Sequence, residues 1–412
     1  MNNIVLARSQ TGYHGQIMGE SMNKTLTDRQ RVLSLCGIYA SIFAWGVSFA
    51  GLMPLMSLTL EARGYDTLMI GLLGAITPVG VILTAPMASG FIQKMGTAPA
   101  IFLASAGVMI TVALLPVYDS YESWLGLRFL SGVCGAIPWI GTETWLNSIA
   151  TEKSRGRITA LYGAIMAISF AIGPLILSLL GTQGNMPYIV YTALLFISLI
   201  PLILIWRMAP VLHHVKGIKF SSFVWAIPSI LAAVMVCGMV DMSFFSFLPI
   251  WGLRIGFGED TAVLLLSIFV IGNVVLQLPI GWLADKTDRY MVLIGCGLVG
   301  AISPILIILA AESTWSIAVI LFFWGGCAWA LYTVSLAILG ERYQGGALTA
   351  ASAVFIVAYE IANIAGPPLA GISMEIWEPH GLMVFMSVFS LIFCIVTITR
   401  QIIKRRKAED PN

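Results

Sequence analysis

Two acidic residues, Asp241 and Glu360, lie inside long apolar stretches of the sequence. A charged side chain in such a stretch is costly to bury, so it usually serves a function. A low-dielectric environment raises the pKa of a carboxyl group toward physiological pH, which suits a group that takes up and releases protons. We therefore expect both acids to carry protons or bind a solute, with a static hydrogen bond between helices as the alternative. The histidines do not fit this task because they lie in polar segments: His14, His213, His214 and His380.

A third charge in an apolar stretch is Arg128. Gly132 and Gly135 follow four and seven residues later, on the same face of a helix. Small residues at such positions let a neighbouring helix or a ligand come close. Arg128 is only about 8 Å from one end of its stretch at 1.5 Å per residue. We expect it to assist proton coupling or bind an anionic group; the alternative is that it extends outward to water.

The elements that must position these charges are long and apolar. Hydrophobic residues make up 58% of the 412 residues and charged residues 10%, whereas a typical soluble domain has about 25% charged residues. An apolar run of about 20 residues can cross a bilayer as a helix, and loops are not tolerated in lipid. The sequence therefore predicts an all-α integral membrane protein with twelve transmembrane helices. The runs are Val32–Leu58, Leu68–Ile92, Ala98–Val117, Ser123–Ser148, Ile158–Leu180, Pro187–Trp206, Phe223–Trp251, Ala262–Leu283, Tyr290–Ala310, Trp315–Leu339, Leu348–Ile372 and Gly381–Ile403.

The twelve runs fall into two groups of six. We expect one six-helix bundle over residues 31–207 and another over residues 222–403. A cytoplasmic leader at 1–30, a connector at 208–221 and a cytoplasmic tail at 404–412 would complete the chain. The leader lacks the apolar core of a signal peptide and is expected to be disordered.

Basic residues are distributed unevenly between the predicted loops. Nearly all of them fall on the side that carries both termini, and only Arg63 and Arg254 fall on the other side. Short cytoplasmic loops hold an excess of lysine and arginine. We therefore expect both termini in the cytoplasm and a multi-pass protein of the cytoplasmic (inner) membrane.

The loop between the eighth and ninth runs has the pattern Gly-x-Leu-Ala-Asp-Lys-x-x-Arg, which includes Gly281, Asp285, Lys286 and Arg289. This pattern resembles the loop signature of the major facilitator superfamily of transporters. The resemblance covers about residues 32–403. It implies two pseudo-symmetric six-helix bundles with a substrate site between them, near the middle of the membrane.

The resemblance implies a gating role for this loop, which locks the cytoplasmic ends of neighbouring helices in the superfamily. Asp285 would face the positive N-terminal end of a helix, and Arg289 would bridge to a carboxylate on another span. The alternative is a loop that only anchors the topology. Asp288 replaces the usual glycine, and the first-half copy, Gly90–Gly96, has no aspartate. Any lock would therefore lie mainly in the second half.

Glycine–proline pairs occur in both groups of helices. Gly173 and Pro174 in the fifth run match Gly366 and Pro367 in the eleventh. With Gly163, the first pair resembles a motif associated with antiporters. A glycine–proline pair also kinks a helix, so a packing kink shared by both halves is the alternative.

Two further patterns lie in and after the fourth run. The segment around Arg128 resembles the fourth-span arginine motif of the superfamily. The pattern Glu-Thr-Trp at Glu143, followed by Arg155-Gly-Arg157, resembles an uncharacterised bacterial subgroup of drug- and sugar-type porters. We expect Glu143 to form a structural ion pair with Arg155 or Arg157.

Aromatic side chains on the first, fourth and tenth spans are candidates for the wall of the central cavity, because the superfamily lines it with these spans and the seventh. Amide side chains on the eighth and eleventh spans are further candidates. Rings in this wall suit an amphipathic or ring-bearing solute by stacking and cation–π contact. Asn273 and Gln277 share a helix face and could instead hydrogen-bond a neighbouring span. Trp251 and Trp315, at span ends, are expected to anchor in the membrane interface. The cavity candidates are Trp45, Trp139, Asn273, Gln277, Trp329, Tyr332 and Asn363.

Other function classes find little support in the sequence. It has no dinucleotide or phosphate-binding glycine loop and no metal-ligand spacing among its six cysteines. A net charge of +2 gives no sign of nucleic-acid binding. We expect a monomeric transporter rather than an enzyme, with no cofactor, the proton as coupling ion, and a small organic molecule as substrate. Export of an amphipathic compound is favoured; proton-linked uptake of a sugar, organic acid or other metabolite, or a membrane sensor that does not transport, are the alternatives.

Overall fold

The structure is a computed structural model that describes residues 27–150, 154–210, 227–310, 313–343 and 345–409. Most of the predicted leader and connector, and the last residues of the predicted tail, lie outside the described residues. The elements are α1 (Asp28–Ala62), α2 (Thr67–Met95), α3 (Thr97–Leu114), α4 (Tyr121–Ile149), α5 (Arg155–Leu180), α6 (Met186–Leu204), η1 (Trp206–Met208), α7 (Pro228–Arg254), α8 (Glu259–Lys286), α9 (Arg289–Leu309), α10 (Thr314–Arg342), α11 (Gly345–Ile376) and α12 (Gly381–Glu409).

Twelve of these helices are long and apolar enough to cross a membrane. The prediction of an all-α protein with twelve transmembrane helices is therefore confirmed. Two helices extend into segments that were predicted to lie outside the bundles. Helix α1 begins at Asp28, within the predicted leader, because Thr27 and Gln30 form a capping box that satisfies free N–H groups of the first turn. Helix α12 continues to Glu409, within the predicted tail.

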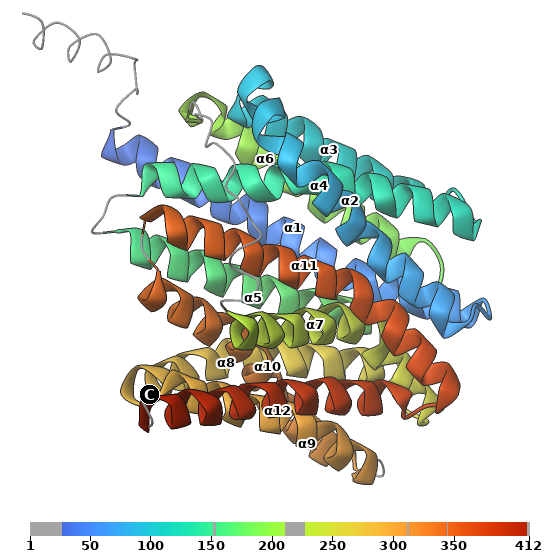
Figure 1. Ribbon diagram of the computed structural model, residues 1–412. Helices are drawn as coiled ribbons and strands as arrows, with labels where there is room; N and C mark the ends of the chain where they lie inside the picture. Colours follow the sequence, from blue (N-terminus) through green and yellow to red (C-terminus); the bar gives the residue numbers. More distant parts are fainter. Residues whose placement is uncertain (1–26, 151–153, 211–226, 311–312, 344, 410–412) are drawn as a thin grey trace, which may run out of the picture.

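The same packing scheme occurs twice along the chain. Helix α1 packs on α5 as α7 packs on α11, α2 packs on α4 as α8 packs on α10, and α3 packs on α6 as α9 packs on α12. A shift of six helices thus relates a first half, α1–α6, to a second half, α7–α12. In Figure 1 most of the first half, in blue and green, lies above most of the second half, in yellow to red. The protein therefore has the predicted pair of pseudo-symmetric six-helix bundles.

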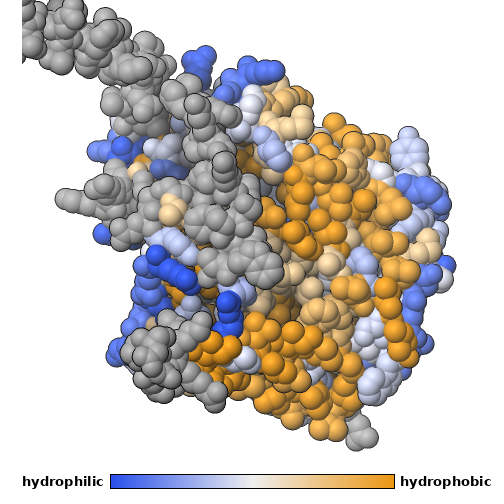
Figure 2. Space-filling view, in the orientation of Figure 1, coloured by the Kyte–Doolittle hydropathy of each residue, from blue (hydrophilic) through white to orange (hydrophobic). Residues whose placement is uncertain are grey.

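The helices run between two ends of the molecule. One end holds the start of α1 and the end of α12, at the left of Figure 1; we call it the terminal end. The opposite end holds the loops that follow α1, α3, α5, α7, α9 and α11. Figure 2 shows hydrophobic side chains over the middle of the molecule and hydrophilic ones toward both ends. This pattern is typical of a protein that faces lipid around its middle and water at its ends.

Helix α7 is the most enclosed span of the described chain. In its apolar core 89% of the residues are buried within the protein, against at most 56% in the other spans. Trp251, near the opposite end of α7, is 0% exposed. The prediction that Trp251 anchors in the membrane interface is therefore wrong, because protein rather than lipid surrounds this helix. Trp315, at the start of α10, is 78% exposed.

The two halves touch along α2 and α11, along α5 and α8, and along α1 and α7. Between α2 and α11 the backbones come very close: Gly71 lies against the carbonyl of Pro367, and Gly371 against that of Thr67. Thr67 begins α2 and Gly371 lies near the end of α11, so this contact is at the opposite end. Glycine permits such a close approach of two helices, and the two halves thereby close this end.

Candidate functional site

A hydrogen-bonded acid lies in the interior of the second half. Asp241, on α7, is 5% exposed and accepts a hydrogen bond of 2.6 Å from the hydroxyl of Tyr359 on α11. Its other oxygen, Oδ1, is buried and has no hydrogen-bond partner within the described ranges. None of the ion pairs found there involves Asp241. A buried carboxylate without a cationic partner is costly unless it binds a proton or a cation.

A second acid, Glu360, joins Asp241 through the packing of α11 on α7. Glu360 is partly buried and lies within electrostatic range of Asp241. The amide of Asn363 donates a long hydrogen bond of 3.5 Å to its Oε2, and Asn363 is only 2% exposed. Glu360 and Asn363 lie one helical turn apart, so they share a face of α11. The structure thus brings three of the predicted residues together.

Tyr332, on α10, connects this acid pair with the first half. Its ring packs edge-on against Tyr359, with 5.4 Å between the ring centroids. Tyr332 is within electrostatic range of Glu360 and also of Glu143 on α4. Tyr162, on α5, lies within range of Tyr332 as well. Tyr332 is therefore located where the two halves face each other.

Among the described residues, Glu143 is bound by a tyrosine and not by Arg157. The hydroxyl of Tyr162 donates to Glu143 at 3.4 Å. Arg157 is exposed, and no ion pair joins it to Glu143 in the described structure. The side chain of Arg155 lies outside the described residues. The predicted pair with Arg157 is not formed, because Arg157 points outward from the first turn of α5 while Tyr162, further along that helix, faces α4.

A small pocket of about 30 Å³ lies within the first half, between α1, α3, α4, α5 and α6. Trp45 and Trp139 line it together with Tyr162, and the two indole rings meet edge to face at 5.7 Å. Trp139 is 43% exposed. The pocket has room for water or a small group rather than for a whole organic solute. Trp45 and Trp139 thus form one aromatic wall, next to the tyrosine that binds Glu143.

The remaining predicted cavity residues lie on the second half. Trp329 is partly buried on α10, one turn before Tyr332. Asn273 is 6% exposed on α8, and Oε1 of Gln277, one turn later, is buried without a hydrogen-bond partner among the described residues. No hydrogen bond within the described ranges joins these two amides to Asp241. Asn273 and Gln277 are therefore not hydrogen-bonded to this acid within the described structure.

Arg128 points into the first half rather than outward. It is 3% exposed, and its Nη2 lies 2.9 Å from the sulfur of Met53 on α1. Its Nε has no hydrogen-bond partner among the described residues. The alternative that Arg128 extends to water is therefore wrong. Gly132, one turn later, contacts Thr77 of α2, whereas Gly135 has open space beside it, so only Gly132 serves close helix contact.

The loop between α8 and α9 is held by charges of the second half. Arg289 bonds Asp285 at 3.0 Å and Glu341, at the end of α10, at 2.9 Å. The bridge from Arg289 to a carboxylate on another helix is thus present. Asp285 is the second acidic partner of Arg289, and its expected role at a helix end stays a prediction. Lys286 lies over the ring of Trp282 at 4.1 Å, and nothing lies within 4 Å of a Cβ built on Gly281.

The glycine–proline pairs lie at matching helix contacts. Helices α5 and α11 continue through Pro174 and Pro367. Gly173 contacts the backbone of α1, and Gly366 contacts the backbone of α7. Both pairs therefore lie where a helix of each half meets its neighbour, as a packing role requires.

Two tyrosines of the site, Tyr359 and Tyr162, could hardly be identified from the sequence. Tyr359 directly precedes Glu360, and this adjacency is its only sequence signal. Tyr162 is 19 residues from Glu143, the acid to which it donates.

The described residues contain no group of three or more histidine, cysteine, aspartate or glutamate side chains arranged to hold a metal ion.

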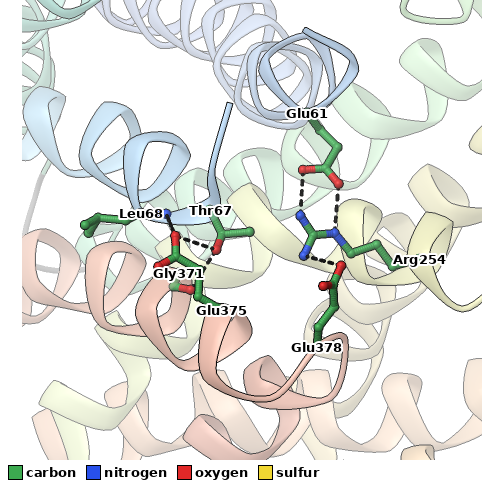
Figure 3. A network of polar contacts seen from close by, with 7 residues as sticks. All are labelled: Glu61, Thr67, Leu68, Arg254, Gly371, Glu375 and Glu378. Atoms are coloured by element: carbon green, nitrogen blue, oxygen red, sulfur yellow. Dashed lines mark hydrogen bonds and ion pairs between the residues drawn. The ribbon is translucent and has the colours of Figure 1, made fainter. Parts of the chain in front are cut away.

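A network of polar contacts joins the two halves at the opposite end (Figure 3). Glu61, on α1, forms an ion pair with Arg254, at the end of α7. Glu375, on α11, accepts hydrogen bonds from the backbone N–H of Leu68 at 3.0 Å and from the hydroxyl of Thr67 at 3.3 Å. These contacts close the same end as the glycines of α2 and α11.

Comparison with known proteins gives a consistent result. Residues 38–265 and 230–412 match the profile of the Major Facilitator Superfamily. The uncharacterised MFS-type transporter YfkF of Bacillus subtilis (strain 168) is 25% identical over 348 residues, which cover 83% of this chain and 89% of YfkF. An uncharacterised MFS-type transporter of Yersinia pestis (strain Pestoides F) is 24% identical over 390 residues, which cover 90% of this chain and 96% of that protein.

Two solved structures share the fold. A mutant of the nucleoside transporter NupG superposes with a TM-score of 0.74 at 12% identity, covering 90% of this chain and 99% of NupG. A D-xylose–proton symporter superposes with a TM-score of 0.69 at 12% identity, covering 89% and 96% of the two chains. At this level of identity the likeness concerns the arrangement of the helices alone.

Proposed function

Because this chain belongs to the major facilitator superfamily and has the fold of a secondary transporter, we propose that it exchanges protons for a small amphipathic organic compound, which it exports. It works as a monomer in the cytoplasmic (inner) membrane, with the terminal end in the cytoplasm. The two halves move relative to each other and expose the site between them to one side at a time.

The observation that carries the proposal is the environment of Asp241. Its carboxylate is 5% exposed, has one neutral donor at 2.6 Å, and lies in range of a second acid, Glu360. Ionisable groups within membrane spans commonly serve as proton relays. Two neighbouring carboxylates also repel each other when both are charged, so a proton bound to one of them stabilises the pair.

The aromatic residues around the acids support an amphipathic solute. Trp45, Trp139 and Tyr162 lie on the first half, and Tyr332, on the second half, lies near Tyr162. Aromatic rings offer a large apolar area, and tyrosine and tryptophan add one polar group that can form a hydrogen bond. A solute held between these walls would contact both halves, so its binding would depend on their relative position.

The closed end is consistent with alternating access, in which one end is shut while the other can open. The contacts between the halves that involve Gly71, Gly371, Glu61 and Glu375 lie at the opposite end. With the terminal end in the cytoplasm, this closure faces the outside.

The test uses purified protein in liposomes that contain a pH-sensitive dye, without an imposed gradient. Candidate solutes are added outside one at a time. Exchange predicts internal alkalinisation when a transported solute enters, and Asp241→Asn should abolish this signal. Asp119→Asn, at a side chain that is 82% exposed at the opposite end, serves as the control and should retain it.

Two results would contradict the proposal. Internal acidification would indicate symport and therefore uptake. Solute entry, measured with a radioactive tracer, without any pH change would exclude the proton as the coupling ion.

A further inference from the structure

Arg254 binds two carboxylates that belong to different halves (Figure 3). Its Nε and Nη2 donate to the two oxygens of Glu61 at 2.8 and 3.0 Å. Its Nη1 lies 3.1 Å from Oε1 of Glu378. Glu61 is on α1 of the first half, whereas Arg254 ends α7 and Glu378 follows α11, both in the second half. One partner of Arg254 would therefore leave it when this end opens, and the other would stay.

The two ion pairs differ in geometry and in burial. The pair with Glu61 has two parallel hydrogen bonds, the strong arrangement of a guanidinium and a carboxylate. The side chains of Arg254 and Glu61 are 20% and 21% exposed, whereas that of Glu378 is 65% exposed. Solvent therefore screens the pair between the halves less than the pair within the second half.

Two other carboxylates of the second half bind backbone N–H groups of the first. Glu375 accepts from Leu68 at 3.0 Å, and Glu259 accepts from Thr182 at 2.7 Å. These two hydrogen bonds, like the pair of Glu61 with Arg254, would break if the two halves separated at this end. Glu378 contributes no contact of this kind among the described residues.

We propose that Glu61 and Glu378 favour different states of the protein through Arg254. Glu61 holds the opposite end closed, and Glu378 keeps Arg254 paired once that end has opened. The inference rests on the proposed alternation of the two halves. Loss of Glu61 weakens only the closed state. Loss of Glu378 leaves Arg254 without an acidic partner in the open state. In the closed state it removes a negative charge that repels the carboxylate of Glu61 on the same guanidinium. Both effects of losing Glu378 favour closure.

The test measures the distance between the halves directly. Spin labels at Asn185, at the start of α6, and Trp315, at the start of α10, report the opening of the opposite end by electron–electron double resonance. Both side chains are exposed. Labelled Glu61→Gln protein should show an increase of about fivefold or more in the ratio of open to closed distances. Glu378→Gln should lower that ratio.

One control variant and one sensitising background keep the outcomes distinct. Asp119→Asn breaks the ion pair of Asp119 with Arg63, which lies at the same end but within the first half, and should leave the ratio unchanged. A decrease for Glu378→Gln is followed most easily in a Gly71→Ala background, where the open state should be more populated.

An unchanged ratio in Glu61→Gln, or an increase in Glu378→Gln, would overturn the proposal. The distances are read without solute or proton gradient. A silent liposome assay would therefore count against proton exchange while leaving this inference standing.

Discussion

A methyl group on Gly71 should act as a wedge between the two halves. A Cβ at this position would lie 2.5 Å from the carbonyl oxygen of Pro367 and 2.9 Å from Cα of Pro368, whereas ordinary contacts lie between 3.4 and 4 Å. Both neighbours are backbone atoms, so α2 and α11 would have to separate by about 1 Å for normal contact.

The energetic effect follows from this clash. Overpacking of a well-packed contact costs about 1–3 kcal/mol. The cost falls only on the state in which α2 and α11 touch. Since 1.4 kcal/mol corresponds to about a tenfold change in an equilibrium constant, Gly71→Ala should raise the ratio of molecules open to molecules closed at the opposite end by about 5- to 100-fold.

The assay follows a single cysteine introduced at Ser246, on α7, with the six native cysteines replaced by serine. Ser246 is 1% exposed and lies against Gly74 of α2, so it becomes reachable only when this contact opens. A membrane-impermeant thiol reagent is added to intact cells, and the labelling rate should rise with the open population.

The matched control is Gly90→Ala on the same helix, where an added Cβ meets nothing within 4 Å. An equal rise in labelling for Gly90→Ala would refute the reasoning. So would a Gly71→Ala variant whose labelling rate equals that of the parent.

Two predictions concern the other charges. Arg128→Met replaces a buried guanidinium that has no acidic partner in the described structure; we expect the melting temperature in detergent to stay the same or rise, and a clear fall would show that Arg128 stabilises the fold. Arg289→Gln removes ion pairs with Asp285 and Glu341, whose side chains are 71% and 64% exposed. We expect the free energy of unfolding to fall by less than about 1 kcal/mol, measured by denaturant titration, and a larger loss would contradict this estimate.

The number and order of the spans can be predicted from the sequence because lipid imposes a length and a composition on each helix. The rotation of a helix about its axis is set instead by its neighbours. Trp251 illustrates the difference: its place at the end of an apolar run predicts an interfacial ring, yet α7 is enclosed and the ring is buried. Hydropathy describes a residue, whereas burial depends on what surrounds it.

The partners of the charged residues were the least predictable part of the site. Asp241 and Glu360 stand out because acids are rare in apolar runs. The donor to Asp241, Tyr359, is 118 residues away in the chain, and a tyrosine in a span has no special meaning by itself. Glu61 and Arg254 are 193 residues apart at span ends, where charges are ordinary. Only the packing of the two halves brings these pairs together.

The enclosure of α7 bears on how the sequence can change over evolutionary time. Helix α2 has nearly the same mean hydropathy as α7, 2.1 against 2.0, but only 44% of its apolar core is buried, against 89%. Lipid accepts one apolar side chain as readily as another. Phe244 and Phe247 of α7 are fully buried against protein, where a change of size leaves a cavity or a clash. Among descendants of a common ancestor, α7 should therefore accumulate substitutions more slowly than spans of equal hydropathy.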